Sequence, residues 1–257
     1  MQISYQQLKP SLSEKFSSII WKIEIDVDQE LLVVETRDKN AHSAAFSSFN
    51  YATGECYLKE QSTENSWWWG LDRAYKGLIY LHGYKNENSP EHRGIIAWDA
   101  KTGETKWQRF NYALGTVSRQ GLIVYNPSVQ PLRPELISPE TGETMKEQMA
   151  ETDPLQRDIL FPEIYDKLLP LPDFIPANAV EPFLHLDYID KSCWAFHVKT
   201  EKGFTQKLLI TQNNEIILTD NLAIDIPKLN PEAFFMQKSY LFCIRNNNYE
   251  IASYLLS

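Results

Sequence analysis

A short turn recurs along the chain and constrains its fold more than any other feature. The stretches Asn50–Glu55, Asp99–Glu104 and Ser138–Glu143 all end in Thr-Gly-Glu, and each lies between two short apolar runs. Glycine accepts the positive φ that tight β connections require. The stretch Thr211–Glu215 resembles them with Asn in place of Gly, and Asn is the next most tolerant residue there. We therefore expect four hairpins of one type.

A second unit, two strand-like segments joined by a polar turn, recurs upstream of these turns. The first segments are Ile20–Ile25, Trp67–Asp72, Leu114–Ser118, Pro182–Asp187 and Ala233–Gln237. Their partners are Leu31–Thr36, Gly77–His82, Gly121–Asn126, Cys193–Lys199 and Tyr240–Arg245. Equivalent positions in successive partners are 46, 44, 72 and 47 residues apart. A period near 45 residues is typical of a four-stranded propeller blade. The sequence thus predicts an all-β, five-bladed β-propeller of four-stranded antiparallel blades.

The long interval contains an insertion between the third and fourth blades. Residues 149–180 hold five prolines, which argue against a regular strand. Within this insertion, Pro154–Leu169 could form a short helix. We interpret the stretch as an excursion within one domain that spans residues 1–257.

The last blade lacks a strand within its own repeat. Tyr249–Leu256 supplies a third strand, and no fourth follows it. An open sheet edge invites aggregation, so a propeller has to close its ring. Gln2–Leu8 is strand-like, and we expect it to pair with the C-terminal blade as its fourth strand.

Charge and composition exclude several classes of partner. The formal charge of -9 and the pI near 5.1 disfavour binding to a nucleic-acid backbone, which requires a basic surface. No stretch approaches the ~20 apolar residues that cross a bilayer, and the N-terminus does not read as a signal peptide. The cysteines, Cys56, Cys193 and Cys243, are scattered in apolar contexts and are expected to be buried free thiols. We expect a cytoplasmic protein with neither nucleic acid nor membrane as a partner.

One stretch carries a family resemblance. Gly94–Trp107, which reads GIIAWDAKTGETKW, resembles the repeat of the quinoprotein-type propellers, and the likeness is partial at residues 44–58 and 135–148. The resemblance implies a propeller fold and no particular activity. The chain is too short for the eight blades of quinone-binding members and lacks their pair of adjacent cysteines, so we expect no cofactor. It more closely resembles an uncharacterised short propeller family of bacterial type.

The most unusual segment contains three consecutive tryptophans. On a strand, Trp67, Trp68 and Trp69 would alternate between faces, so at least one would be open to a sugar ring or another planar ligand. The alternative is that all three pack between blades. Asp72 and Arg73 end the same segment, as ligand contacts or as a surface ion pair.

A second candidate is the pair His185 and Asp187. Their i, i+2 spacing places both side chains on one face of a strand, where they could orient a substrate or supply two metal ligands. The alternative is a structural hydrogen bond. No third ligand is evident nearby, so no metal is expected. The histidines His42, His82 and His92 are expected to be solvated in or near loops.

Two functional hypotheses follow. The first is a non-catalytic propeller that acts as a binding or scaffolding module for a protein or small-molecule partner, with the 149–180 insertion as a contact. The alternative is a carbohydrate-binding or glycoside-hydrolase-like protein, whose paired carboxylates would come from Glu24, Asp72 and Asp187. Nucleophile and phosphate-binding motifs are not found in the sequence.

Overall fold

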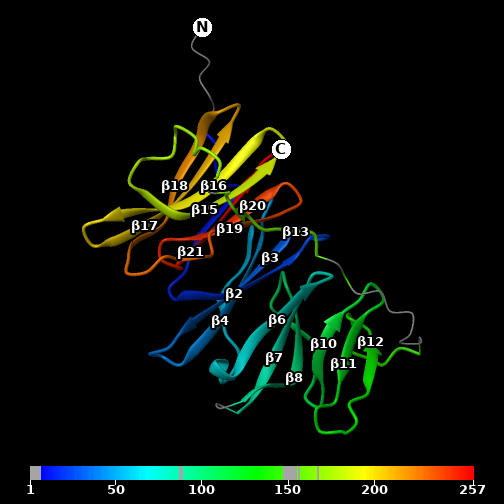
Figure 1. The fold of residues 1–257 in the computed structure, drawn as a ribbon. Coiled ribbons are helices and arrows are strands. Elements are labelled where there is room, and N and C mark those ends of the chain that lie inside the picture. Colours follow the sequence, from blue (N-terminus) through cyan, green and yellow to red (C-terminus); the bar gives the residue numbers. More distant parts are fainter. Residues whose placement is uncertain (1–6, 87–88, 147–154, 156, 167) are drawn as a thin grey trace. The chain divides into compact units, whose positions relative to one another are not determined.

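The computed structural model describes residues 7–86, 89–146, 155, 157–166 and 168–257, and these form an all-β fold. Contacts divide the chain into two compact units (Figure 1). The continuous unit is Ser18–Arg157, and the split unit joins the described residues up to Ser17 with Asp158–Ser257. In the described residues, no helix has the length and apolar character needed to cross a membrane.

The continuous unit contains three antiparallel sheets, in each of which every strand pairs with its successor. The first sheet consists of β2 (Ile19–Asp26), β3 (Leu31–Asp38), β4 (Ser43–Asn50) and β5 (Cys56–Gln61). The second consists of β6 (Trp69–Tyr75), β7 (Leu78–Asn86), β8 (Ser89–Asp99) and β9 (Thr105–Arg109). The third consists of β10 (Ala113–Val117), β11 (Leu122–Tyr125) and β12 (Pro134–Ile137).

The split unit contains two antiparallel sheets of five strands. One has, in spatial order, β14 (Glu163–Ile164), β15 (Ala179–Tyr188), β16 (Lys191–Thr200), β17 (Gly203–Gln212) and β18 (Glu215–Ile226). The other has, in spatial order, β1 (Leu12–Lys15), β21 (Glu250–Leu255), β20 (Tyr240–Arg245), β19 (Phe234–Gln237) and β13 (Ile159–Leu160).

All five predicted strand pairs are present, one in each sheet. They are β2 with β3, β6 with β7, β10 with β11, β15 with β16, and β19 with β20. The prediction of an all-β fold is confirmed. The predicted number of four strands is found in two of the five sheets.

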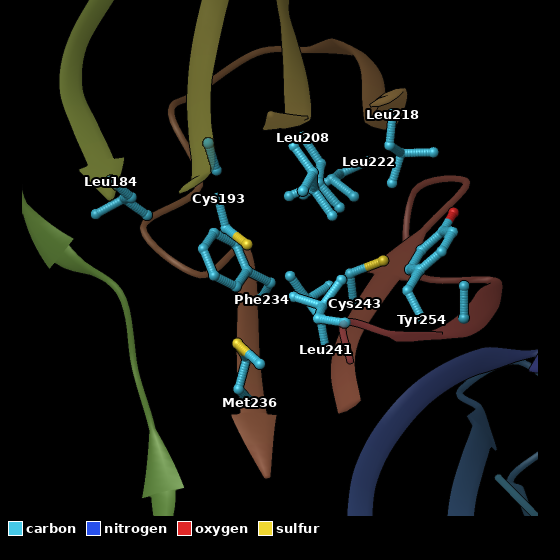
Figure 2. Packing of buried hydrophobic residues seen from close by; sticks show 14 of the residues in the cluster. Leu184, Cys193, Leu208, Leu218, Leu222, Phe234, Met236, Leu241, Cys243 and Tyr254 are labelled. Atoms are coloured by element: carbon cyan, nitrogen blue, oxygen red, sulfur yellow. The ribbon is translucent and has the colours of Figure 1, made fainter. Parts of the chain in front are cut away.

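Side chains alternate between the two faces of a strand, so the second sheet contributes to two hydrophobic clusters. On β7, Ile79 and Leu81 pack with the first sheet, whereas Leu78 and Tyr80 pack with the third. In the split unit one apolar cluster joins both sheets (Figure 2). It contains Cys193 and Cys243, and burial raises the pKa of each thiol to about 12. Cys56 is exposed, so the expectation of burial was wrong there.

Three of the four predicted turns share one hydrogen-bonding pattern. Gly54, Gly103 and Gly142 have φ of 77°, 72° and 69°. Each donates its N–H to the carbonyl oxygen four residues back, at 2.9 Å in all three. The fourth is different: Asn213 and Asn214 form a two-residue hairpin, with φ of 50° and 66°. Two successive left-handed residues reverse the chain sooner than the glycine turn does.

The N-terminal pairing was predicted for the wrong residues. β1, at Leu12–Lys15, pairs with the C-terminal strand β21. Gln2–Leu8 falls largely outside the described residues, although the N–H of Leu8 donates to the carbonyl of Ile217. Leu12 and Phe16 are both buried, which fixes the strand at this position.

The insertion also differs from its prediction. Its described residues contain no helix at Pro154–Leu169. Instead β13 and β14, of two residues each, pair with β19 and β15 at the edges of the two sheets. Pro162 lies between them, which is compatible with short edge strands.

Candidate functional site

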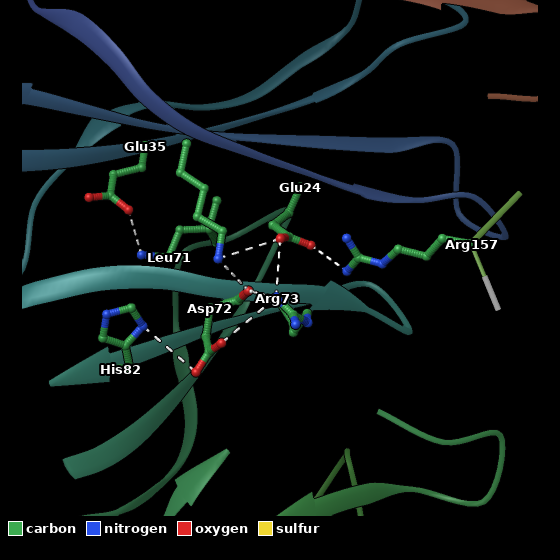
Figure 3. A network of polar contacts seen from close by, with 8 residues as sticks. Glu24, Glu35, Leu71, Asp72, Arg73, His82 and Arg157 are labelled. Carbon is green, nitrogen blue, oxygen red and sulfur yellow. Dashed lines mark hydrogen bonds and ion pairs between the residues drawn. The ribbon is translucent and has the colours of Figure 1, made fainter. Parts of the chain in front are cut away.

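Adjacent strands β2 and β6 bring charged side chains together in the continuous unit (Figure 3). The carboxylate of Glu24 is 4% exposed and lies 3.5 Å from Lys22 Nζ, 3.4 Å from the Arg73 guanidinium and 2.5 Å from that of Arg157. Three cations therefore compensate one buried carboxylate. A glycosidase requires a second carboxylate about 5–10 Å away, and the groups within 3.5 Å of the Glu24 carboxylate are all cations.

Asp72 and Arg73 form an ion pair, which was one of the two alternatives, but Asp72 is buried and the pair does not lie at the surface. Its Oδ1 lies 4.0 Å from the Arg73 guanidinium, and its Oδ2 lies 3.7 Å from His82 Nδ1. Asp72 is the extra residue of a β-bulge, because Leu71 pairs with Leu81 while Arg73 pairs with Tyr80. Desolvation raises the pKa of Asp72, although Lys22 and Arg73 act in the opposite direction.

His82 lies on β7 and is buried, so the prediction that it is solvated was wrong. Its ring stacks on that of His92, half-buried on β8, with 3.5 Å between centroids. A Cβ at Gly70 would lie 2.7 Å from His82 Nε2, so glycine makes room for the ring. Burial and nearby positive charge lower the pKa of His82 to about 2, so the ring is neutral.

The polar atoms of this cluster are poorly satisfied. Within the described parts of the chain, Asp72 Oδ2 and both ring nitrogens of His82 have no hydrogen-bond partner. Leaving a buried polar group unpaired costs about 1–3 kcal/mol. Asp72, His82 and His92 each offer one ligand atom, and these atoms all lie within 4.8 Å of one another. This His-His-Asp cluster is the candidate cation site among the residues that the structure describes.

A buried ion pair next to the cluster holds the tryptophan segment. Arg37 Nε donates to Glu35 Oε1 at 2.5 Å, and the other guanidinium nitrogens donate to the carbonyls of Trp67 and Trp69 at 3.3 and 2.9 Å. The second oxygen of Glu35 accepts the N–H of Leu71 at 2.7 Å. The pair therefore connects β3 with the start of β6.

The three tryptophans do not alternate along one strand. Trp67 and Trp68 belong to a single 3-10 turn, η1 (Ser66–Trp68), and only Trp69 lies on β6. All three are partly exposed. Asn65 precedes the turn in a left-handed conformation, with φ of 51°, which breaks the extended run.

An aromatic surface surrounds the Arg37 guanidinium. Its carbon lies 5.1 Å from the ring centroid of Trp67, 5.7 Å from that of Trp21 and 5.5 Å from that of Tyr84. Trp21 is 54% exposed because a β-bulge displaces it from the register between Ile20 and Lys22. The guanidinium thus stabilises the rings of this aromatic surface by cation–π contacts.

His185 and Asp187 lie in the split unit and share a face, as predicted. His185 Nε2 is 3.0 Å from Asp187 Oδ1, and the Ser192 hydroxyl donates to the same oxygen. The His185 ring also packs on Trp194, with 4.1 Å between centroids. The carboxylate therefore lies between the imidazole and the hydroxyl, an order that does not activate Ser192 as a nucleophile.

The insertion exposes apolar side chains. Six large ones are more than one-third exposed over a dozen residues: Leu160, Phe161, Ile164, Leu168, Leu169 and Leu171. We call this the apolar segment. Ile164, Leu169 and Leu171 also line a small hollow with Phe183 of β15.

A family model described as "Domain of unknown function (DUF4905)" matches residues 25–107, less than half of the chain. The match covers all three members of the His-His-Asp cluster and the Glu35–Arg37 pair. No curated protein matches the chain.

Solved structures match at low similarity. The β-propeller domain of the Trilobed protease from Pyrococcus furiosus is 10% identical, with a TM-score of 0.33 over 93% of this chain and 67% of that one. The endo-arabinase from Bacteroides thetaiotaomicron is 10% identical, with a TM-score of 0.29 over 98% of each chain. Raptor from Chaetomium thermophilum is 8% identical, with a TM-score of 0.29 over 98% of this chain and 29% of that one. Values this low assign no activity to the chain.

Several residues of this site were not predicted from the sequence. Trp21 looks like one more apolar residue in a strand, and only the bulge directs it outward. His82 and His92 offered a usable signal, because they flank one hairpin connection at similar distances from its turn. Arg37 offered none, since its partners at Trp67 and Trp69 are about 30 residues away in sequence.

Proposed function

We propose that the five sheets are the blades of a single five-bladed propeller that spans residues 1–257. Each sheet contains one predicted strand pair, and the period near 45 residues relates the pairs. The pairing of β1 with β21 supports a blade completed by the N-terminal strand. The likeness of Gly94–Trp107 to the quinoprotein-type repeat agrees with this architecture.

We further propose that the protein is a non-catalytic binding module that docks a protein partner on its apolar segment. The observation that carries this proposal is the exposure of Phe161 and Ile164, at 65% and 67%, among the six exposed apolar side chains of this segment. Contiguous exposed apolar side chains mark interaction sites, because removing them from water gains about 25 cal/mol per Å². The partner would therefore present an apolar groove.

The test is a Phe161→Ser/Ile164→Ser double variant. Affinity capture with quantitative mass spectrometry should identify proteins that the unmodified chain retains and the double variant loses. Ile216→Ser, at a residue 47% exposed on β18, is the matched control and should retain them. Equal capture by all three proteins, each with an unchanged circular-dichroism spectrum, would contradict the proposal.

A second candidate function is carbohydrate binding on the aromatic surface. Exposed Trp21 and partly exposed Trp67, which both lie against the Arg37 guanidinium, offer flat apolar faces that suit sugar rings. A bound oligosaccharide at 100 times its Kd would stabilise the chain by about 2.7 kcal/mol, which a thermal-shift panel detects. Trp21→Ala should abolish the shift, whereas Leu132→Ala, at another exposed residue of the same unit, should preserve it. A panel without any shift contradicts this candidate.

A further inference from the structure

The His-His-Asp cluster combines burial with missing partners. The side chains of His82 and Asp72 are 5% and 12% exposed, yet Asp72 Oδ2 and His82 Nδ1 face each other at 3.7 Å without a hydrogen bond to any described residue. Buried polar atoms are almost always satisfied by the protein, by water or by an ion. These unsatisfied atoms converge on one point, which indicates a ligand between them.

The distances fit a metal ion. Two donor atoms bound to one ion at about 2.1 Å lie about 3.4 Å apart in a tetrahedral site and at most about 4.2 Å apart. The separation between Asp72 Oδ2 and His82 Nδ1 falls inside that interval. The spread of 4.8 Å over all three donors is about 1.4 Å wider than the tetrahedral separation, so the half-buried His92 has to move toward Asp72 and His82 when the ion binds. The two imidazole rings lie parallel, so this movement also has to rotate the His92 ring until its nitrogen points toward the ion.

The backbone determines which nitrogen of His82 is available. Nε2 lies against Gly70, close enough that a Cβ there would be at 2.7 Å, whereas Nδ1 points to Asp72. Nδ1 is therefore the ligand atom of His82.

The donor chemistry selects the class of ion. Two imidazole nitrogens with one carboxylate oxygen suit zinc and its neighbours, whereas calcium and magnesium require oxygen ligands. The neighbouring cations Lys22, Arg37, Arg73 and Arg157 form ion pairs with Glu24 and Glu35, so Asp72 is the carboxylate that the cluster itself supplies to the ion.

We propose that Asp72, His82 and His92 bind one divalent transition-metal ion of the zinc class, with a fourth position left for water or a ligand. This site is in the continuous unit and does not depend on the apolar segment. It adds a metal to a chain for which the sequence predicted none.

The test titrates the full chain, freed of metal by EDTA, with ZnCl₂ in a calorimeter. We expect one ion per chain, no response to MgCl₂, and with CoCl₂ the visible absorption of a low-symmetry nitrogen-ligated site. His92→Ala and Asp72→Asn should each weaken Zn²⁺ binding by at least about 100-fold. His42→Ala, at an exposed histidine, should leave it unchanged.

A second measurement needs no variant and therefore does not depend on their folding. Diethyl pyrocarbonate modifies accessible histidines, so Zn²⁺ should protect His92 and leave His42 reactive, as mass spectrometry of the peptides would show. Absence of stoichiometric Zn²⁺ binding, equal protection of both histidines, or undiminished binding by both ligand variants would overturn the proposal.

Discussion

At the residue scale, the continuous unit buries acidic groups next to backbone donors. Asp26 is 4% exposed, and its Oδ2 accepts the N–H of Gly77 at 2.8 Å. Desolvation raises the pKa of Asp26 even though hydrogen bonds from Gly77 and neighbouring amides lower it. The folded state therefore holds the protonated form better than the unfolded state does.

The raised pKa of Asp26 in the folded state determines how stability changes with pH. The stability that Asp26 contributes is present below its unfolded pKa and is lost as the pH rises through the raised folded value. Asp26→Asn keeps the acceptor for Gly77 and has no charge to desolvate. We expect the variant to unfold at higher urea concentration than the unmodified chain at pH 7, with a flatter profile from pH 4 to pH 8. Asp173→Asn, at an exposed residue, should keep the original profile; identical profiles for all three proteins would refute this account.

At the scale of elements, the glycine turns also connect sheets. The turn of the third sheet lies on Trp107 of β9, whose indole N–H donates to the carbonyl of Pro139 at 2.8 Å. A Cβ at Gly142 would lie 2.7 Å from the buried ring of Trp107. The glycine therefore provides both a positive φ and close packing.

A matched pair of variants separates these two roles. Gly77 has a φ of 72°, close to the 69° of Gly142, but a Cβ there meets no atom within 4 Å. Gly77→Ala should cost about 1–2 kcal/mol, the strain of a left-handed residue. Gly142→Ala should cost clearly more, since the ring has to move as well. Urea unfolding of both variants measures the difference, and equal losses would show that the contact with Trp107 contributes nothing.

The sequence revealed the elements better than the site. Apolar runs and Thr-Gly-Glu turns are local signals, so the five inner strand pairs could be predicted, whereas the pairings of β1, β13 and β14 could not. The bulges at Trp21 and Asp72 depend on the pairing register between two strands. That register cannot be predicted from the residues of one strand alone. The turn at Trp67 depends on Arg37, and the burial of His82 depends on Gly70. Both require knowledge of the neighbouring strand.

At the scale of the whole molecule, the split unit depends on a pairing between distant parts of the chain. Leu12 of β1 is 2% exposed, and Ser13 and Arg245 both hydrogen-bond to Glu250 of β21. Leu12→Ala should lower the stability of this unit by about 2–5 kcal/mol. Hydrogen exchange should then accelerate at the amides of β21 and remain unchanged on β7. Lys15→Ala, exposed on the same strand, is the control; equal acceleration on β7 would show that the two units unfold together.

The pairing of β1 with β21 also means that β1 is synthesised long before its partner strand. From Lys15 to its partner Glu250 the count is 250 − 15 = 235 residues. At about 5–20 residues per second, β1 waits roughly 12–47 s before its neighbour exists. The continuous unit is complete long before then and can fold while translation proceeds. Throughout that interval β1 has no partner strand, so a chaperone would have time to bind it.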